Sequence, residues 1–138
     1  NLQPSIRYIL TAINDTVYEG NATSSDKDLT RWANQGVLLL NTALTTTVGK
    51  SGQHFKIWQP FCAYLFDWLN WYNPGIVYIY TGKKAEEWRD SISDNNYKLI
   101  TTHPASAAYN KQQQWECNNV FNEVNRILYN VYGSKIIW

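Results

Sequence analysis

The chain has 138 residues, of which 44% are hydrophobic, so it is long enough to bury the core of one domain. Its formal net charge of +1 excludes a protein that binds nucleic acid by bulk charge alone, which needs a large positive excess. Acidic residues are nevertheless absent between Asp28 and Asp67 and between Asp94 and Glu116. Such acid-free windows suit an anionic substrate, although chance also produces them in a chain with few charges.

The first half of the chain predicts two helices and one strand. Pro4-Ser5 opens a helix whose apolar residues recur at helical spacing, and a short helical turn follows at residues 29–34. Residues 37–40 form an unbroken apolar run, which predicts a buried strand that is covered on both faces. A loop rich in threonine and glycine comes next, at residues 42–52.

The second half continues to alternate helices with strands. We expect a helix over residues 58–70 that buries Phe61, Leu65, Trp68 and Leu69, and strands at residues 76–80 and 98–101. A helix from Gly82 to Ile92 lies between these strands, and the last helix has the clearest stripe: Val120, Phe121, Val124, Ile127, Leu128 and Val131. This alternation predicts an α/β protein with three layers, α/β/α, around a short parallel sheet.

The two cysteines give little evidence for special chemistry. Cys62 and Cys117 both lie in apolar helical surroundings, which favours buried thiols over a disulfide. A pair of thiols without a neighbouring histidine is poor evidence for a metal site. No apolar stretch is long enough to span a bilayer and no signal peptide is visible, so we expect an intracellular protein with no membrane partner.

Two of the predicted strands deliver a single polar side chain where they end. The strand at residues 37–40 ends on Asn41, and the strand at residues 98–101 runs into His103. Open α/β sheets build their ligand pockets at the carboxyl ends of their strands. An amide and an imidazole at such an edge are the best clue to function that the residues themselves provide.

Five stretches of the chain, taken in order, carry a resemblance to a known family. Residues 32–45, Trp-Ala-Asn-Gln-Gly-Val-Leu-Leu-Leu-Asn-Thr-Ala-Leu-Thr, closely resemble the uracil-binding segment of uracil-DNA glycosylases. Further along, the chain is similar to other segments of that family at Ser51, His54, Trp58 and Phe61, at residues 79–85, at Thr102-His103-Pro104-Ala105-Ser106 and at Ile137-Trp138. The likeness spans nearly the whole chain, and its first segment is specific by itself.

The resemblance implies a hydrolase that flips uracil out of DNA and cuts its N-glycosidic bond, leaving an abasic site. Asn41 would read the base, because a side-chain amide offers a donor and an acceptor that match uracil N3–H and O4. His103 would stabilise the negative charge that develops on the departing base, as a donor aimed at uracil O2. The reaction would need water and no cofactor.

The resemblance also implies contacts with DNA. Ser5, Gly82, Lys83 and Ser106 lie in stretches similar to the loops that contact the DNA backbone in the family. Ala105 and Ala107 depart from the family pattern, which has a serine and a wedge-like leucine there. Tyr109 is a candidate to replace this wedge, which fills the space left by the flipped base.

A further motif of the family is expected upstream of residue 1. The family's Gly-Gln-Asp-Pro-Tyr-His motif, whose aspartate orients the attacking water, would precede Pro4-Ser5, and its strand is central to a four-stranded sheet. We therefore interpret residues 1–138 as a uracil-DNA glycosylase-like domain that lacks its N-terminal part, and we expect these residues alone to be inactive.

Two other classes of function compete with the glycosylase. The departures near His103 and the missing aspartate motif favour a catalytically silent protein of the same fold that binds DNA or assembles with a polymerase or virion partner. A module that binds through exposed aromatic residues is the third class, prompted by 7 tryptophans and 10 tyrosines. Uracil-containing DNA is the expected partner of the enzyme, with a protein inhibitor or a replication protein as a further candidate, in a host cell or a virus.

Overall fold

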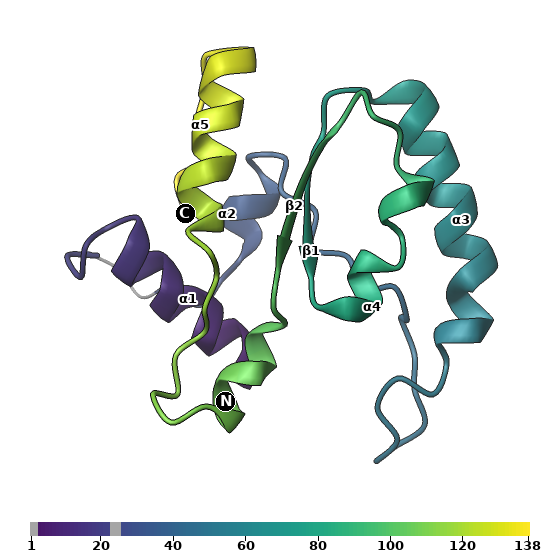
Figure 1. The fold of residues 1–138 in the computed structure, drawn as a ribbon, viewed down its shortest axis with the longest axis horizontal. Helices are drawn as coiled ribbons and strands as arrows, with labels where there is room; N and C mark the ends of the chain where they lie inside the picture. Colours follow the sequence, from purple (N-terminus) through teal and green to yellow (C-terminus); the bar gives the residue numbers. More distant parts are fainter. Residues whose placement is uncertain (1–2, 23–25) are drawn as a thin grey trace.

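A computed structural model of the chain describes residues 3–22 and 26–138. Two parallel strands form the central layer, with α1, α2 and α5 on one side and α3 and α4 on the other (Figure 1). In chain order the elements are α1 (Pro4–Thr16), α2 (Thr30–Ala33), α3 (Phe55–Tyr72), β1 (Val77–Thr81), α4 (Lys83–Glu86), η1 (Arg89–Ser91), β2 (Tyr97–Thr101), η2 (Pro104–Tyr109) and α5 (Val120–Tyr132). The predicted α/β/α architecture is confirmed.

The alternation of side chains along β1 divides the core into two clusters. Val77 and Ile79 pack against a cluster formed mainly by α1, α2 and α5, whereas Tyr78 and Tyr80 face Cys62 and other residues on the α3 side. This is the period of two expected of a strand. Most of the predicted stripe of the last helix is confirmed, because Val120, Phe121, Val124 and Ile127 are buried and Leu128 packs against the core. Val131, which the stripe also included, is 45% exposed.

Residues 37–40 are not a hydrogen-bonded strand, so this part of the prediction is wrong. They are extended, but the sheet within the described residues contains only β1 and β2. Leu38 and Leu39 are 67% and 55% exposed, against the expected burial on both faces. An apolar run can predict an extended segment, but the segment joins a sheet only where a neighbouring strand supplies backbone hydrogen bonds.

The faces of α3 also differ from the prediction. Cys62 and Phe66 are buried, whereas Phe61 and Trp68, which we expected in the core, are 43% and 44% exposed. Gly82 starts only a short helix, α4, and the expected longer helix is completed by the separate turn η1. The apolar residues of α3 thus extend beyond the face that the described core covers.

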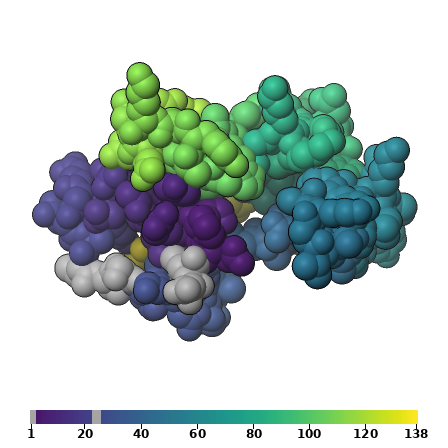
Figure 2. All heavy atoms as spheres, turned by 90° about the horizontal axis from the view of Figure 1, so that it is seen from below, coloured from purple at the N-terminus to yellow at the C-terminus, as the bar shows by residue number. Residues whose placement is uncertain are grey.

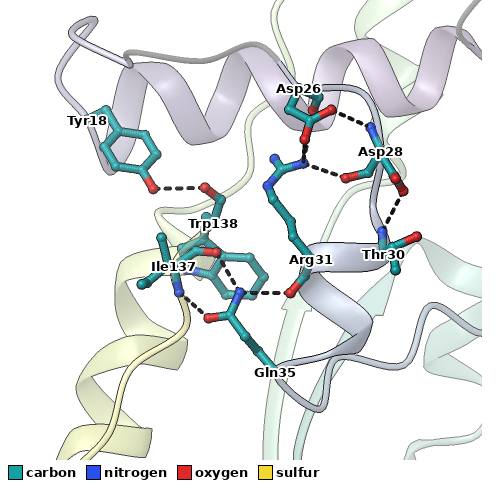
Figure 3. A network of polar contacts seen from close by, with 8 residues as sticks. All are labelled: Tyr18, Asp26, Asp28, Thr30, Arg31, Gln35, Ile137 and Trp138. Carbon is teal, nitrogen blue, oxygen red and sulfur yellow. Dashed lines mark hydrogen bonds and ion pairs between the residues drawn. The ribbon is translucent and has the colours of Figure 1, made fainter.

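The carboxyl end of the chain is fixed by side-chain hydrogen bonds (Figure 3). Gln35 accepts a hydrogen bond from the Ile137 amide at 2.7 Å and donates to the Ile137 carbonyl at 2.9 Å. The Tyr18 hydroxyl donates to the Trp138 carbonyl at 2.8 Å. Trp138 packs edge-on against Trp32 and Phe121, so the last residues join α1, α2 and α5 into one body.

The buried hydroxyl of Tyr80 makes stability sensitive to alkaline pH. Burial, with a smaller contribution from Tyr78, raises the pKa of Tyr80 to about 12. An unfolded tyrosine titrates near pH ~10, so the stability from the protonated hydroxyl is complete below about pH 10 and is lost as the pH rises toward 12. We expect the wild-type chain to lose more free energy of unfolding between about pH 8 and about pH 11 than Tyr80→Phe, as measured by urea unfolding. Equal losses in the two proteins would contradict this.

Candidate functional site

The carboxyl ends of β1 and β2 lie side by side and bring Gly82 against His103. Thr81 and Thr101 are in register, and the Gly82 amide donates to the Thr101 carbonyl at 2.8 Å. A Cβ added to Gly82 would lie 2.9 Å from the His103 Cβ. The Gly82 backbone, at φ 88° and ψ 171°, also has a conformation that is essentially restricted to glycine. Only glycine fits at this junction of the two strands.

We therefore expect Gly82→Ala to lower the free energy of unfolding by about 1–3 kcal/mol, through backbone strain and the clash with His103. Gly133→Ala is the matched control, because Gly133 also has a positive φ, of 68°, but no atom within 4 Å of an added Cβ. Its substitution should cost only the strain of the left-handed conformation. Urea unfolding of both variants measures the difference, and equal losses would show that the contact with His103 is unimportant.

The imidazole of His103 has one nitrogen occupied and one free. The ring Nδ1 accepts a hydrogen bond from the Ala105 amide at 3.1 Å. The backbone carbonyl of His103 accepts another from the Ser106 amide at 2.9 Å. In a neutral ring whose Nδ1 is an acceptor, the proton is on Nε2. The exposed ring therefore presents an N–H donor that no hydrogen bond to a described residue occupies. The start of η2 sets this tautomer.

Trp115 supports the segment that leads to His103, and sequence reasoning missed it. Its indole N–H donates to the Thr102 carbonyl at 2.9 Å and to the Thr102 hydroxyl at 3.1 Å. The hydroxyls of Thr101 and Thr102 donate in turn to the Glu116 carbonyl. The one signal in the sequence was the tryptophan at the end of the polar run of residues 110–115. A buried indole N–H needs a hydrogen-bond acceptor.

Asn41 lies at the end of the extended segment and is exposed. Leu40, just before it, packs against the cluster that contains Tyr80, and the next carbonyl, that of Thr42, accepts a hydrogen bond from the Cys62 thiol at 3.4 Å. Beyond it the loop is tied to α3, because the Trp58 indole donates to the Thr45 hydroxyl at 2.8 Å. Within the described part of the chain, no hydrogen bond joins Asn41 to His103.

The remaining predicted site residues lie on α1, on η2 and on the turn after β1. Ser106 is in η2 directly after it, Lys83 follows Gly82, and Ser5 is at the start of α1, which contacts η2. Ala107 is fully buried, so it cannot act as a wedge, whereas Tyr109 is 93% exposed at the end of η2. The structure thus gathers all the predicted site residues except Asn41 on α1, η2 and the turn after β1.

Viewed from the side to which the strands run, the molecule is hollowed (Figure 2). The recess separates the mass of α1 and η2 from the mass formed by the start of α3 and the loop before it. Two cavities lie elsewhere: one of about 310 Å³ beside Thr42 and Lys84, and one of about 430 Å³ between β2 and α5. Neither is lined by Asn41 or His103.

Two classes of feature are absent from the described part of the chain. Residues 3–22 and 26–138 contain no group of three or more His, Cys, Asp or Glu side chains that could hold a metal ion. They also contain no helix that is long and apolar enough to cross a membrane. Both cysteines are buried and free.

Comparisons with known proteins give a consistent relationship, although no family model matches the chain. The uracil-DNA glycosylase of Acinetobacter baumannii (strain SDF) is 35% identical over 129 residues, which are 92% of this chain and 53% of that protein. The uracil-DNA glycosylases of Halalkalibacterium halodurans and Mycoplasmopsis pulmonis are 32% and 30% identical over 99% and 86% of this chain. The chain is similar to uracil-DNA glycosylases. It spans between 53% and 60% of the length of these curated relatives.

Solved structures show the same fold. The crystal structure of mimivirus uracil-DNA glycosylase matches 98% of this chain with a TM-score of 0.78 and 20% identity. A variant of mimivirus UNG in complex with UGI matches 99% of this chain with a TM-score of 0.79, and this chain covers 56% of it. The described residues therefore have the α/β fold of the uracil-DNA glycosylases.

Proposed function

We propose that the chain acts in the removal of uracil from DNA, by hydrolysis of the N-glycosidic bond of a flipped-out nucleotide. The observation that carries this proposal is the similarity, at 30–35% identity over 86–99% of the chain, to proteins named uracil-DNA glycosylase. A free Nε2–H donor on His103, where two parallel strands end, is the local feature that agrees with it. The similarity covers little more than half of each relative.

His103 is the proposed catalytic residue. When the bond between the sugar C1′ and uracil N1 breaks, its electron pair leaves with the base and the charge spreads to O2. A donor already aimed at that oxygen stabilises the transition state, and such a contact is typically worth about 3–4 kcal/mol. The hydrogen bond from the Ala105 amide to Nδ1 prepares His103 for this role, because it places the proton on Nε2.

Asn41 is the proposed reader of the base. Its amide would donate to uracil O4 and accept from N3–H, whereas cytosine presents an amino group and a bare nitrogen at these positions. In an enclosed site the wrong base would leave these polar groups unpaired. For both residues to contact one base, Asn41 and His103 have to face each other across the recess of Figure 2.

The proposed DNA contacts lie on α1, on η2 and on the turn after β1. Ser5, Gly82, Lys83 and Ser106 would bind the phosphates, which positions the duplex without reading its sequence. Tyr109, exposed at the end of η2, would occupy the space that the flipped nucleotide leaves in the stack. The buried position of Ala107 makes Tyr109 the better candidate for this wedge.

A catalytically silent protein that binds DNA or assembles with a replication partner is the second candidate. Ala105 and Ala107 at positions where the resemblance predicts a serine and a leucine favour it, together with the exposed aromatic side chains of α3. An inhibitor or a replication protein as a partner stays a prediction. The mimivirus UNG variant forms a complex with UGI, so UGI is the reagent with which to test it.

The experiment that tests the proposal uses a chimera, in which this chain is joined to the part of the Acinetobacter baumannii relative that lies outside the match. We expect the chimera to form abasic sites in uracil-containing single-stranded DNA, detected as alkali-sensitive cleavage on a gel. Chain 1–138 alone is expected to be inactive in the same assay. A chimera that unfolds cooperatively but forms no abasic sites would overturn the proposal in favour of the silent protein.

A further inference from the structure

Helix α3 has a second apolar face, which points away from the sheet. Its buried residues, Cys62 and Phe66, face the core. Ile57, Tyr64 and Trp71 follow one another at every second turn, so they form a line on the opposite side of the helix. They are 68%, 71% and 81% exposed. This line and the exposed apolar side chains beside it make up what we call the outer face of α3: Ile57, Phe61, Tyr64, Trp68, Trp71 and Tyr72.

A further element of the same three-layer domain would not cover this line. α3 is the outermost element on its side of the sheet (Figure 1). Another helix packed on the sheet would lie beside α3, in the same layer, and would leave Tyr64 and Trp71 uncovered. A helix beyond α3 would make a fourth layer, whereas domains are built from two or three. The outer face is therefore suited to a separate molecule.

The charge of α3 favours a protein partner over nucleic acid or lipid. Within α3, which is described throughout, the charged residues are Lys56 and Asp67. Single-stranded nucleic acid stacks on aromatic side chains but also needs a basic groove along its phosphates. Helices that lie on membranes carry several lysines or arginines on their polar face. Apolar side chains at heptad spacing are instead typical of contacts between helices.

We propose that the outer face of α3 binds the same face of a second copy of this chain, with the two helices antiparallel. A symmetric dimer uses one patch on both subunits, so the patch has to be complementary to itself. Tyr64 lies near the middle of α3, and Ile57 and Trp71 lie equally far from it on either side. In an antiparallel pair Tyr64 therefore meets the partner's Tyr64, and the smaller Ile57 meets the partner's larger Trp71.

The charges of α3 also fit an antiparallel pair. Lys56 lies in the first turn of the helix and Asp67 in its second half. Antiparallel pairing turns Lys56 of each copy toward the half of the other helix that carries Asp67. A parallel pair would instead place the two lysines at one level and the two aspartates at another, and like charges that face each other are unfavourable.

The area of the outer face is large enough for a stable dimer. With about 150–250 Å² per aromatic side chain, its exposed fractions amount to roughly 700 Å² per copy. Stable interfaces bury about 800 Å² from each partner. Trp68 and Tyr72 already contact each other, with ring centroids 5.1 Å apart, so ordering them costs less when the dimer forms.

Sedimentation equilibrium of chain 1–138 and of the chimera tests the dimer. We expect both to reach twice the monomer mass, which is 16.0 kDa for chain 1–138, above about 10 µM, because interfaces of this size bind with micromolar or tighter affinity. A dimer of chain 1–138 with a monomeric chimera would show that the rest of the protein covers the outer face, and would overturn the proposal. Monomers in both samples would also overturn it, and binding to vesicles of phosphatidylcholine and phosphatidylserine would then identify a lipid surface as the occupant.

Two charge variants locate the contact at Tyr64. Tyr64→Lys and Tyr64→Glu each place like charges against each other across the two-fold axis, and we expect each to weaken the dimer by about 100-fold or more. An equal mixture of the two should restore it, because opposite charges then meet. Tyr129→Lys, at an exposed tyrosine of α5 on the other side of the sheet, is the matched control and should leave the dimer unchanged. A dimer that survives Tyr64→Lys, or a mixture that stays monomeric, would contradict the antiparallel pairing.

Discussion

Replacing His103 by leucine in the chimera is expected to lower kcat for uracil excision by about 100- to 1,000-fold, with little change in KM. The loss corresponds to one preorganised donor to the developing negative charge, about 3–4 kcal/mol. A donor that acts only in the transition state lowers kcat and kcat/KM equally when it is removed. Single-turnover cleavage of a uracil-containing oligonucleotide measures the chemical step directly.

Gln112→Leu is the control for His103→Leu, because it places the same apolar side chain at an exposed position of the nearby loop. It should leave the rate unchanged. A His103→Leu chimera that folds and excises uracil at the rate of the parent chimera would remove His103 from the mechanism.

The second large effect is expected for Asn41→Asp. A carboxylate at this position only accepts hydrogen bonds, so it loses the donor to uracil O4 and places a negative charge against that oxygen. A buried hydrogen bond that is lost and replaced by an unpaired charged group costs about 3 kcal/mol, which predicts a loss of excision of about 100-fold or more. Gel assays on matched uracil and cytosine substrates measure the change in selectivity.

Asn34→Asp is the matched control for Asn41→Asp, since it makes the same substitution at another asparagine of the same stretch. Its excision rate should equal that of the parent chimera. If Asn41→Asp and His103→Leu both left the rate unaltered, the proposed site would be wrong.

The elements that the sequence predicted well are those whose partners lie nearby in the same fold. Pro4 and a helical stripe predicted α1, the stripe from Val120 predicted α5, and both strands were located to within a residue at each end. Each of these segments buries its apolar face against another described element, so pattern and structure agree. Gly82 and His103, both named as site residues from the sequence, lie close together where β1 and β2 end.

The predictions that failed concern apolar surfaces that the described residues leave exposed. Residues 37–40 have the composition of a buried strand, and Phe61 and Trp68 the spacing of a buried stripe, yet Leu38, Leu39 and both aromatic side chains are exposed. A hydrophobic pattern predicts that a surface is buried, but it does not identify the element that buries it. The support of His103 by Trp115 was missed for another reason: a hydrogen bond between two loops leaves no periodic signal.

The proposed site depends on the Asn41 amide and the His103 imidazole binding the same base. A crystal structure of the chimera with free uracil tests this directly. We predict that the Asn41 side-chain amide lies within hydrogen-bond distance, about 3 Å, of uracil O4 and N3, and that His103 Nε2 lies at a similar distance from O2. Uracil bound away from either side chain, or an intact recess in which only one of them reaches the base, would contradict the account.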